Sequence, residues 1–277
     1  MEKRVNNAVS HLFGKLGIEE FQVRLILQNK DRYYREWYKN KLNEDGTVKL
    51  INGIPQKRKI SESIKNLKKI QSRIKDILLV PIGFPEYCYG GVKNKSNILN
   101  AKVHKGKKYI FTTDIKDFFP SIAKQKVFHL FKKLGHSKEV SKILSELVTY
   151  NGVLPQGTPT SSCIANLVFK EAGDRLDLLS RNNNITFTSF IDDLTFSSNN
   201  DFKQLTNEIV QIIKSSQYKV NQKKTHYCSK PIEITGVITK LKNLEPPERI
   251  LKKLEKLAKS DPKYSPLENY TKQILKY

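Results

Sequence analysis

Hydrophobic positions recur at helical spacing in several parts of the chain. From Ser61 onward, isoleucine and leucine occupy every third or fourth position as far as Leu78, with lysine and arginine between them, which predicts an amphipathic helix. The same kind of periodicity occurs in five further stretches, 1–40, 124–150 (interrupted near Gly135), 162–180, 202–216 and 248–260. Two prolines precede the last stretch, which begins with a glutamate, and both features are typical of a helix N-terminus.

Other stretches have the composition of strands and turns. Residues 107–115 ("KKYIFTTDI") and 231–240 ("PIEITGVITK") are rich in β-formers, and 185–200 ("ITFTSFIDDLTFSSNN") has strand residues on both sides of an acid pair, as in a hairpin. A turn at "NEDGTVK" precedes "LINGIPQKRKI", which suits an extended or hairpin segment. Residues 81–96 ("PIGFPEYCYGGVKNKS") end the preceding helix and predict an irregular basic loop, and residues 151–162, which are rich in Pro, Gly, Thr and Ser, predict a second loop.

From residue 107 to 238 the expected order is strand, helix, helix, β-hairpin, helix, strand. This order predicts an α+β fold, with a ferredoxin-like sheet that carries its helices on one side. In such a sheet the end of the 107–115 strand lies beside the tip of the hairpin. Asp114 and Asp192 are 78 residues apart in the sequence, and this topology would make them neighbours.

Composition restricts the class of protein. The chain is 38% apolar, contains no run of about 18 apolar residues, and begins without the apolar core of a signal peptide. Its three cysteines, Cys88, Cys163 and Cys228, are far apart and lack CxxC spacing. We therefore expect reduced thiols, a cytoplasmic location and no membrane partner.

Charge indicates the class of partner. The chain has 50 Lys and Arg against 27 Asp and Glu, a net charge of +23, and residues 51–110 alone hold 14 basic and 3 acidic side chains. Such a surplus favours nucleic acid as a partner, because neutralising phosphates releases counterions. A solvated lysine-rich surface is the alternative, and charge alone does not decide between the two.

The acid pair Asp192–Asp193 has two interpretations. By itself it is a polar turn, where aspartate is common. Together with Asp114 it would form a set of hard oxygen ligands for two Mg²⁺ ions roughly 3.5–4 Å apart, as in two-metal phosphoryl transfer. The aromatic and β-branched residues on both sides favour the second interpretation, because they build a rigid hairpin that a solvated turn does not need.

Six stretches between about residues 45 and 240 resemble motifs of reverse transcriptases. "FIDDLTFSS" resembles the family's [YF]xDD box, "TTDIKDFFPSI" its first catalytic aspartate motif, and "LPQGTPTSSCIANL" its LPQG motif. "QKRKISESIKNLKKIQSRI" is similar to the fingers motif. "NAKVH" and "ITGVI" are similar to the NAxxH and VTG signatures of retron enzymes. The chain has Phe190 where Tyr is more usual, Ser162 and Ser63 where Pro is frequent, and ITG for VTG, and none of these departures removes an acid.

The resemblance implies roles for the acids and for a nearby lysine. Asp114, Asp192 and Asp193 would be the metal-binding carboxylates, and Lys224 is near the family's lysine that protonates the leaving pyrophosphate. The adjacent Lys223 is an alternative for that lysine.

The resemblance also implies residues that bind the nucleotide. Arg58 would grip the triphosphate, Phe119 would be the steric gate that favours dNTPs, and Gln156 with Gly157 would touch the nucleotide. The alternatives are a generic surface role for Arg58, core packing for Phe119 and a simple turn at Gly157.

The NAKVH stretch leaves its own question open. Asn100 and His104 would either fix the fold or contact RNA.

By this resemblance the fold would be the right-hand polymerase fold, with N-terminal helices and fingers in residues 1–106, a palm in 107–238 (with fingers elements around 124–162) and a small helical thumb in 239–277. The protein would be a retron-type RNA-directed DNA polymerase that copies part of a cognate structured non-coding RNA from dNTPs, holds an RNA–DNA duplex, and acts with an effector protein in anti-phage defence. The alternatives are another defence or group II intron-like reverse transcriptase, and a pseudo-polymerase that only binds RNA.

Overall fold

The computed structural model describes residues 2–43 and 45–277, with helices and strands that confirm the α+β prediction. The chain forms two compact units. The first consists of residues up to 41 with 49–84 and 117–170, and the second of 42–48, 85–116 and 171–277. Among the described residues, no helix is both long and apolar enough to cross a membrane. The division into fingers, palm and thumb stays a prediction.

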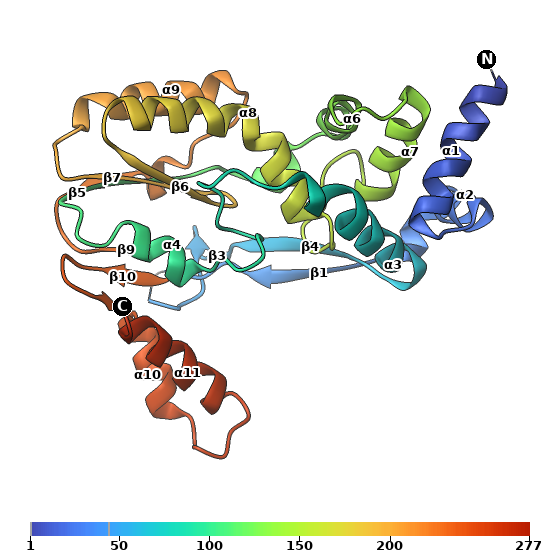
Figure 1. Ribbon diagram of the computed structural model, residues 1–277. Coiled ribbons are helices and arrows are strands. Elements are labelled where there is room, and N and C mark those ends of the chain that lie inside the picture. Colours follow the sequence, from blue (N-terminus) through green and yellow to red (C-terminus); the bar gives the residue numbers. More distant parts are fainter. Residues whose placement is uncertain (1, 44) are drawn as a thin grey trace. The chain divides into compact units, whose positions relative to one another are not determined.

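Helices dominate the first unit (Figure 1). They are α1 (Glu2–Leu16), α2 (Glu20–Gln28), α3 (Lys65–Ile74), the short α5 (Phe118–Ser121), α6 (Lys124–Lys133), α7 (Lys138–Val148) and the first part of α8 (Ser161–Asn182). The predicted interruption near Gly135 is confirmed, because α6 ends just before this residue, whose φ is +87°. Leu67 and Ile70 of α3 and Leu144 of α7 are buried in the core of this unit.

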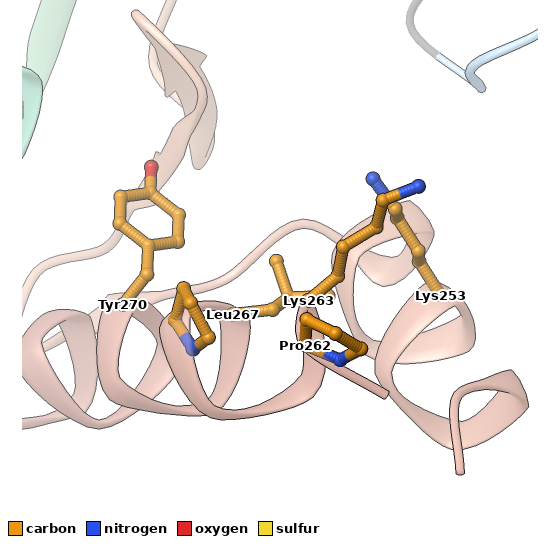
Figure 2. A pocket seen from close by; sticks show the side chains of 6 residues that line it. Lys253, Pro262, Lys263, Leu267 and Tyr270 are labelled. Atoms are coloured by element: carbon orange, nitrogen blue, oxygen red, sulfur yellow. The ribbon is translucent and has the colours of Figure 1, made fainter. Parts of the chain in front are cut away.

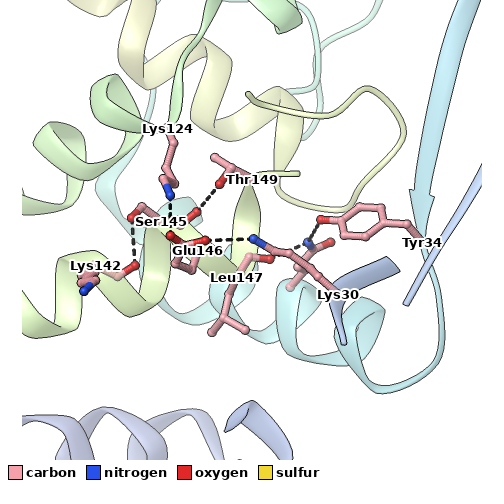
Figure 3. A network of polar contacts seen from close by, with 9 residues as sticks. Lys30, Tyr34, Lys124, Lys142, Ser145, Glu146, Leu147 and Thr149 are labelled. Carbon is pink, nitrogen blue, oxygen red and sulfur yellow. Dashed lines mark hydrogen bonds and ion pairs between the residues drawn. The ribbon is translucent and has the colours of Figure 1, made fainter. Parts of the chain in front are cut away.

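A partly buried polar network ties α7 to other segments of the first unit (Figure 3). The carboxylate of Glu146 pairs with Lys30 and Lys124. Gln71 on α3 donates a hydrogen bond to the Leu147 carbonyl at 2.8 Å and another to the Tyr34 hydroxyl at 3.2 Å. Because an unbonded amide in the core is costly, the two hydrogen bonds of Gln71 fix the positions of α3, α7 and the start of the 34–40 strand relative to one another.

A two-stranded ribbon projects from the helices of the first unit. Strand β1 (Tyr34–Asn40) pairs antiparallel with β4 (Lys57–Ser63), and β2 (Leu50–Ile51) pairs with β3 (Ile54–Pro55) across the turn at Asn52 and Gly53. The prediction of an extended or hairpin segment at 50–60 is confirmed. The helical interpretation of residues 1–40 is wrong for 34–40, because that stretch pairs with β4 along its whole length.

The second unit contains the ferredoxin-like sheet. Its strand order is β6 (Thr186–Phe190), β7 (Asp193–Ser198), β5 (Tyr109–Asp114) and β8 (His226–Cys228), and every neighbouring pair is antiparallel. Helix α9 (Thr206–Ser215) and the later part of α8 cover one face of this sheet (Figure 1). The hairpin, its pairing with the 109–114 strand and the helices on one side are as predicted, whereas the fourth strand is β8 and not the predicted 231–240.

Alternation along the strands gives the sheet two different faces. One face carries large apolar side chains, and the rings of Phe187 and Phe196 stack there with centroids 4.6 Å apart. The other face carries the small hydroxyls of Thr188, Thr195 and Ser197, which are all buried. Asp114 and Asp193 extend this polar face to the end of the sheet, because they pair with each other in the same register.

The prediction of a single strand at 231–240 is wrong. Thr235 and Gly236 both have positive φ, so the stretch turns back on itself between β9 (Ile232–Ile234) and β10 (Val237–Thr239). These strands join β11 (Leu244–Glu245) in a separate sheet, and β8 completes the ferredoxin-like sheet instead. Helix α4 (Asn97–Val103) packs against this small sheet through a shared apolar core.

Two helices follow the small sheet. They are α10 (Glu248–Lys256), which lies within the predicted 248–260, and α11 (Tyr264–Leu275), which the sequence patterns had not singled out.

Candidate active site

The paired acids lie at the tip of the β6–β7 hairpin, as predicted. Ile191 occupies the turn with φ +61°, a left-handed conformation that is costly for a β-branched residue. The turn therefore depends on its surroundings. Asp192 follows it, and its carbonyl accepts a hydrogen bond from the Ile115 amide at 2.9 Å. Asp193 begins β7 directly opposite Asp114.

Asp114 accepts three hydrogen bonds, two at its carboxylate and one at its backbone carbonyl. Its side chain is nearly buried, with 6% of the residue exposed. Asn221 donates from Nδ2 to Oδ1 at 2.8 Å, Lys224 donates from Nζ to Oδ2 at 2.9 Å, and the Asn221 amide donates to the Asp114 carbonyl at 2.8 Å. Sequence reasoning missed Asn221, because nothing in "VNQKK" distinguishes it from an ordinary turn residue.

Lys224 brings a positive charge to all three carboxylates. Its Nζ lies 2.9 Å from Asp114 Oδ2 and 3.9 Å from Asp193 Oδ1. Partial burial would lower the pKa of Lys224, but Asp193, Asp114 and Asp192 outweigh this effect and raise it. Lys224 is therefore protonated at neutral pH and positioned at the acids. The structure thus brings together Asp114, Asp192, Asp193 and Lys224.

The carboxylates fit a site for a hard divalent cation. Asp114 and Asp193 present oxygens to a common ammonium group, and Asp192 is close enough to act on the same charge. Among residues 2–43 and 45–277, no three His, Cys, Asp or Glu side chains are placed so that they could hold a metal ion together. Mg²⁺ does not need three, because it is usually held by one or two carboxylates together with substrate phosphates and water.

An extended loop segment, residues 87–90, lies alongside the tip of the hairpin. Ser189 on β6 exchanges backbone hydrogen bonds with Tyr87 and Tyr89, each at 2.8 Å. The chain then brings Gly90 so close to the turn that a Cβ atom there would lie 2.6 Å from the backbone nitrogen of Ile191. Only glycine allows this approach, so Gly90 belongs to the support of the acid turn. The sequence contains a signal for this close approach, the Gly90–Gly91 pair, but it lies in a stretch whose composition predicts only an irregular loop.

Helix α4 lies on the polar face of the sheet. Of the NAKVH stretch, Asn100, Ala101 and His104, which directly follows the helix, are buried, whereas Lys102 is exposed. His104 contacts Ser197 and Thr188 with its two ring nitrogens, each at 2.7 Å. Asn100 donates to the Thr235 hydroxyl at 3.3 Å. Burial, with a smaller effect of Lys107, lowers the pKa of His104 to about 3, so its ring is neutral.

Three other predicted site residues gather in the first unit. Arg58 is an exposed residue of β4 and has no ion pair within the described part of the chain. The Gln156 carbonyl accepts a hydrogen bond from the Ser61 amide at 2.8 Å. Gly157 has φ +113°, and a Cβ atom there would lie 2.9 Å from Ile60 Cγ2. The LPQG loop is thus docked on the strand that carries Arg58, and Gly157 permits the contact.

The two phenylalanines of α5 are placed differently. Phe118 is 2% exposed and packs edge-on against Phe169, so it serves the core. Phe119 is only half-buried, with its ring beside that of Phe118. Core packing, the alternative explanation for Phe119, therefore applies better to Phe118.

A shallow cavity of about 310 Å³ lies between α10 and α11 (Figure 2). Its lining combines Lys253 and Lys263 with apolar side chains, Pro262, Pro266, Leu267 and Tyr270. It contains none of the predicted site residues.

The fold and the arrangement of the acids indicate which protein family the chain belongs to. The second unit is a ferredoxin-like α+β sheet with an aspartate hairpin at one end and a third aspartate on the neighbouring strand. The family model described as "Reverse transcriptase (RNA-dependent DNA polymerase)" matches residues 27–239. The chain belongs to this family.

Curated relatives with similar sequences are retron reverse transcriptases. The retron Se72 enzyme of Salmonella heidelberg is 33% identical over 217 residues, which cover 78% of this chain and 54% of the relative. The retron Ec86 enzyme of Escherichia coli is 29% identical, with coverage of 73% and 61%, and the retron Ec48 enzyme of the same species is 32% identical, with coverage of 71% and 53%. The chain thus spans roughly half to three-fifths of these relatives.

Proposed function

We propose that the protein is a retron-type RNA-directed DNA polymerase, which copies part of a cognate structured RNA into single-stranded DNA. The observation that carries the proposal is the pairing of Asp114 with Asp193, with Asp192 and Lys224 at the same place. Family membership and the retron relatives support the same reaction.

In the proposed reaction the chain's own residues hold and orient the reacting groups. Asp114, Asp192 and Asp193 would hold two divalent cations, and reverse transcriptases as a family use such ions. When bound, two ions activate the attacking 3′-hydroxyl and stabilise the leaving oxygen. Asn221 keeps the Asp114 carboxylate in place, and protonated Lys224 is the general acid for the pyrophosphate.

The nucleotide would be bound by residues of the first unit. Arg58 can form two parallel hydrogen bonds to phosphate oxygens, which a lysine cannot. The half-buried Phe119 ring would exclude the 2′-hydroxyl, and the Gln156–Gly157 loop, anchored on β4, would complete the nucleotide site.

The partner is proposed to be RNA and the RNA–DNA duplex made from it. The net charge of +23 provides the electrostatic attraction, and A-form duplexes are recognised mainly through shape and backbone. The retron resemblance further suggests a role in anti-phage defence with an effector protein. The three separated cysteines suggest a cytoplasmic location.

Sequencing of the nucleic acid that copurifies with the protein tests the proposal. A retron enzyme should yield one defined RNA covalently or stably joined to a DNA copy of part of it, and the Asp192→Asn/Asp193→Asn variant should yield the RNA alone. Random or repetitive DNA from the wild-type protein would indicate a different reverse transcriptase. RNA without DNA from both proteins would indicate an RNA-binding pseudo-polymerase.

A further inference from the structure

His104 connects both strands of the aspartate hairpin to α4. One ring nitrogen contacts Thr188 on β6 and the other contacts Ser197 on β7, each at 2.7 Å. All three side chains are at most 2% exposed. Because a neutral imidazole has one donor and one acceptor nitrogen, and hydroxyls can play either role, the ring can satisfy both contacts at once.

The contacts are made on the same face of the sheet as the acids. Asp193 and Ser197 are four residues apart on β7, so their side chains point to the same side. Thr188 pairs with Thr195, which lies between them on that face. A change in the spacing or twist of β6 and β7 at His104 would therefore displace the acid turn.

Helix α4 is itself fixed at its other end. Asn97 donates to the Thr235 carbonyl at 3.0 Å and to the Tyr270 hydroxyl at 2.7 Å, and Asn100 donates to the Thr235 hydroxyl. Ile98 and Ala101 pack into a core shared with β9, β10 and α11. The helix is thus anchored to the small sheet and to α11, and it can act as a rigid support.

Based on this geometry, we propose that His104 is a positioning residue for the polymerase reaction, which fixes the aspartate hairpin to α4 and through α4 to the β9–β10 turn. The inference rests on the proposed function. It gives the NAKVH and ITG stretches a common role, which is to hold the aspartate hairpin in place. His104 touches neither substrate nor the acids. Its effect is carried by Thr188 and Ser197.

The test measures the rate of single-nucleotide addition, the affinity for dNTP and the affinity for RNA. His104→Phe keeps a ring but removes both hydrogen bonds, and it should lower the maximal rate by about 10- to 100-fold, since small misplacements of reacting groups cost this much. The dNTP and RNA affinities should stay within about 3-fold, because His104 is fully buried and presents no surface to either ligand. His104→Asn keeps a polar group near Ser197 and should restore part of the rate.

Hydrogen exchange supplies a readout that does not need activity. In His104→Phe the amides of β6 and β7 should exchange faster, while those of α9 should not change. Ile213→Ala, a core truncation on α9, is the matched control for lost stability. It should lower the thermal stability without slowing nucleotide addition at a temperature where both variants are folded.

The outcomes separate this inference from the proposed function. An unchanged rate and unchanged exchange in His104→Phe would overturn the positioning role while wild-type extension stands, and so would an equal rate loss in Ile213→Ala. If His104→Phe does not fold, Thr188→Val and Ser197→Ala, which each remove one contact, should slow addition by about 3- to 10-fold. Absence of extension by the wild-type protein would sink the proposed function, and the exchange result would still decide the role of His104.

Discussion

The buried His104 makes the stability of the protein depend on pH in a calculable way. In the folded protein burial lowers the pKa of this ring to about 3, whereas its ordinary value is 6.5. As the pH falls below 6.5, the unfolded chain takes up a proton and the folded chain does not. The free energy of unfolding contributed by this residue is therefore complete above the ordinary pKa and is lost progressively as the pH falls from 6.5 to 3.

The magnitude follows from the size of the interval. Each pH unit between the two pKa values is worth about 1.4 kcal/mol, so the step from about pH 7.5 to about pH 5 should cost roughly 2 kcal/mol. Most of this loss falls below pH 6.5.

Urea unfolding followed by far-UV circular dichroism measures the loss. The matched variant is His104→Gln, which keeps a polar side chain but cannot titrate in this range. The wild-type protein should lose roughly 2 kcal/mol more than the variant between the two pH values, because all other titrating groups are shared. An equal loss in both proteins would show that His104 titrates as it does in water, and would refute its burial between α4 and the hairpin.

Three further substitutions test the site. Gly90→Ala should slow nucleotide addition and lower the free energy of unfolding by about 1–3 kcal/mol, because the added methyl group meets the Ile191 backbone. The control is Gly14→Ala, where nothing lies within 4 Å; it should neither slow nucleotide addition nor lower the free energy of unfolding. Phe119→Val should raise the ratio of rNTP to dNTP incorporation by about 10- to 100-fold in a competition assay, and an unchanged ratio would mean that this ring is no gate. Lys224→Met should lower the rate of addition by about 100-fold, with Lys223→Met as a near-neutral control; equal effects would contradict the assignment of the acid.

The sheet and the acid site could be predicted because local patterns determine them. Alternation in 185–200 fixes a hairpin, and the order of elements places its tip beside the end of the 107–115 strand. Asp114 was therefore expected next to Asp192, and in the structure it pairs with the adjacent Asp193. The strand at 231–240 was misread because its composition is uniform. Only the left-handed backbone at Thr235 and Gly236 divides it, and threonine gives little warning of that conformation.

The residues that support the site were harder to find. Asn221 and Gly90 act through contacts with residues far away in the sequence, which no periodicity reports. One signal was present for His104, because Thr188 and Ser197 belong to a row of small hydroxyls with a period of two. Such a row on a buried sheet face needs polar partners, and His104 supplies one.

Primer extension on the cognate RNA, with Mg²⁺ and a single dNTP, tests the central claim most directly. The wild-type protein should add the nucleotide, and Asp192→Asn/Asp193→Asn should not, although it should bind the RNA with unchanged affinity. Extension by both proteins at the same rate, or by neither, would contradict the assignment of Asp114, Asp192 and Asp193 as the centre of a polymerase.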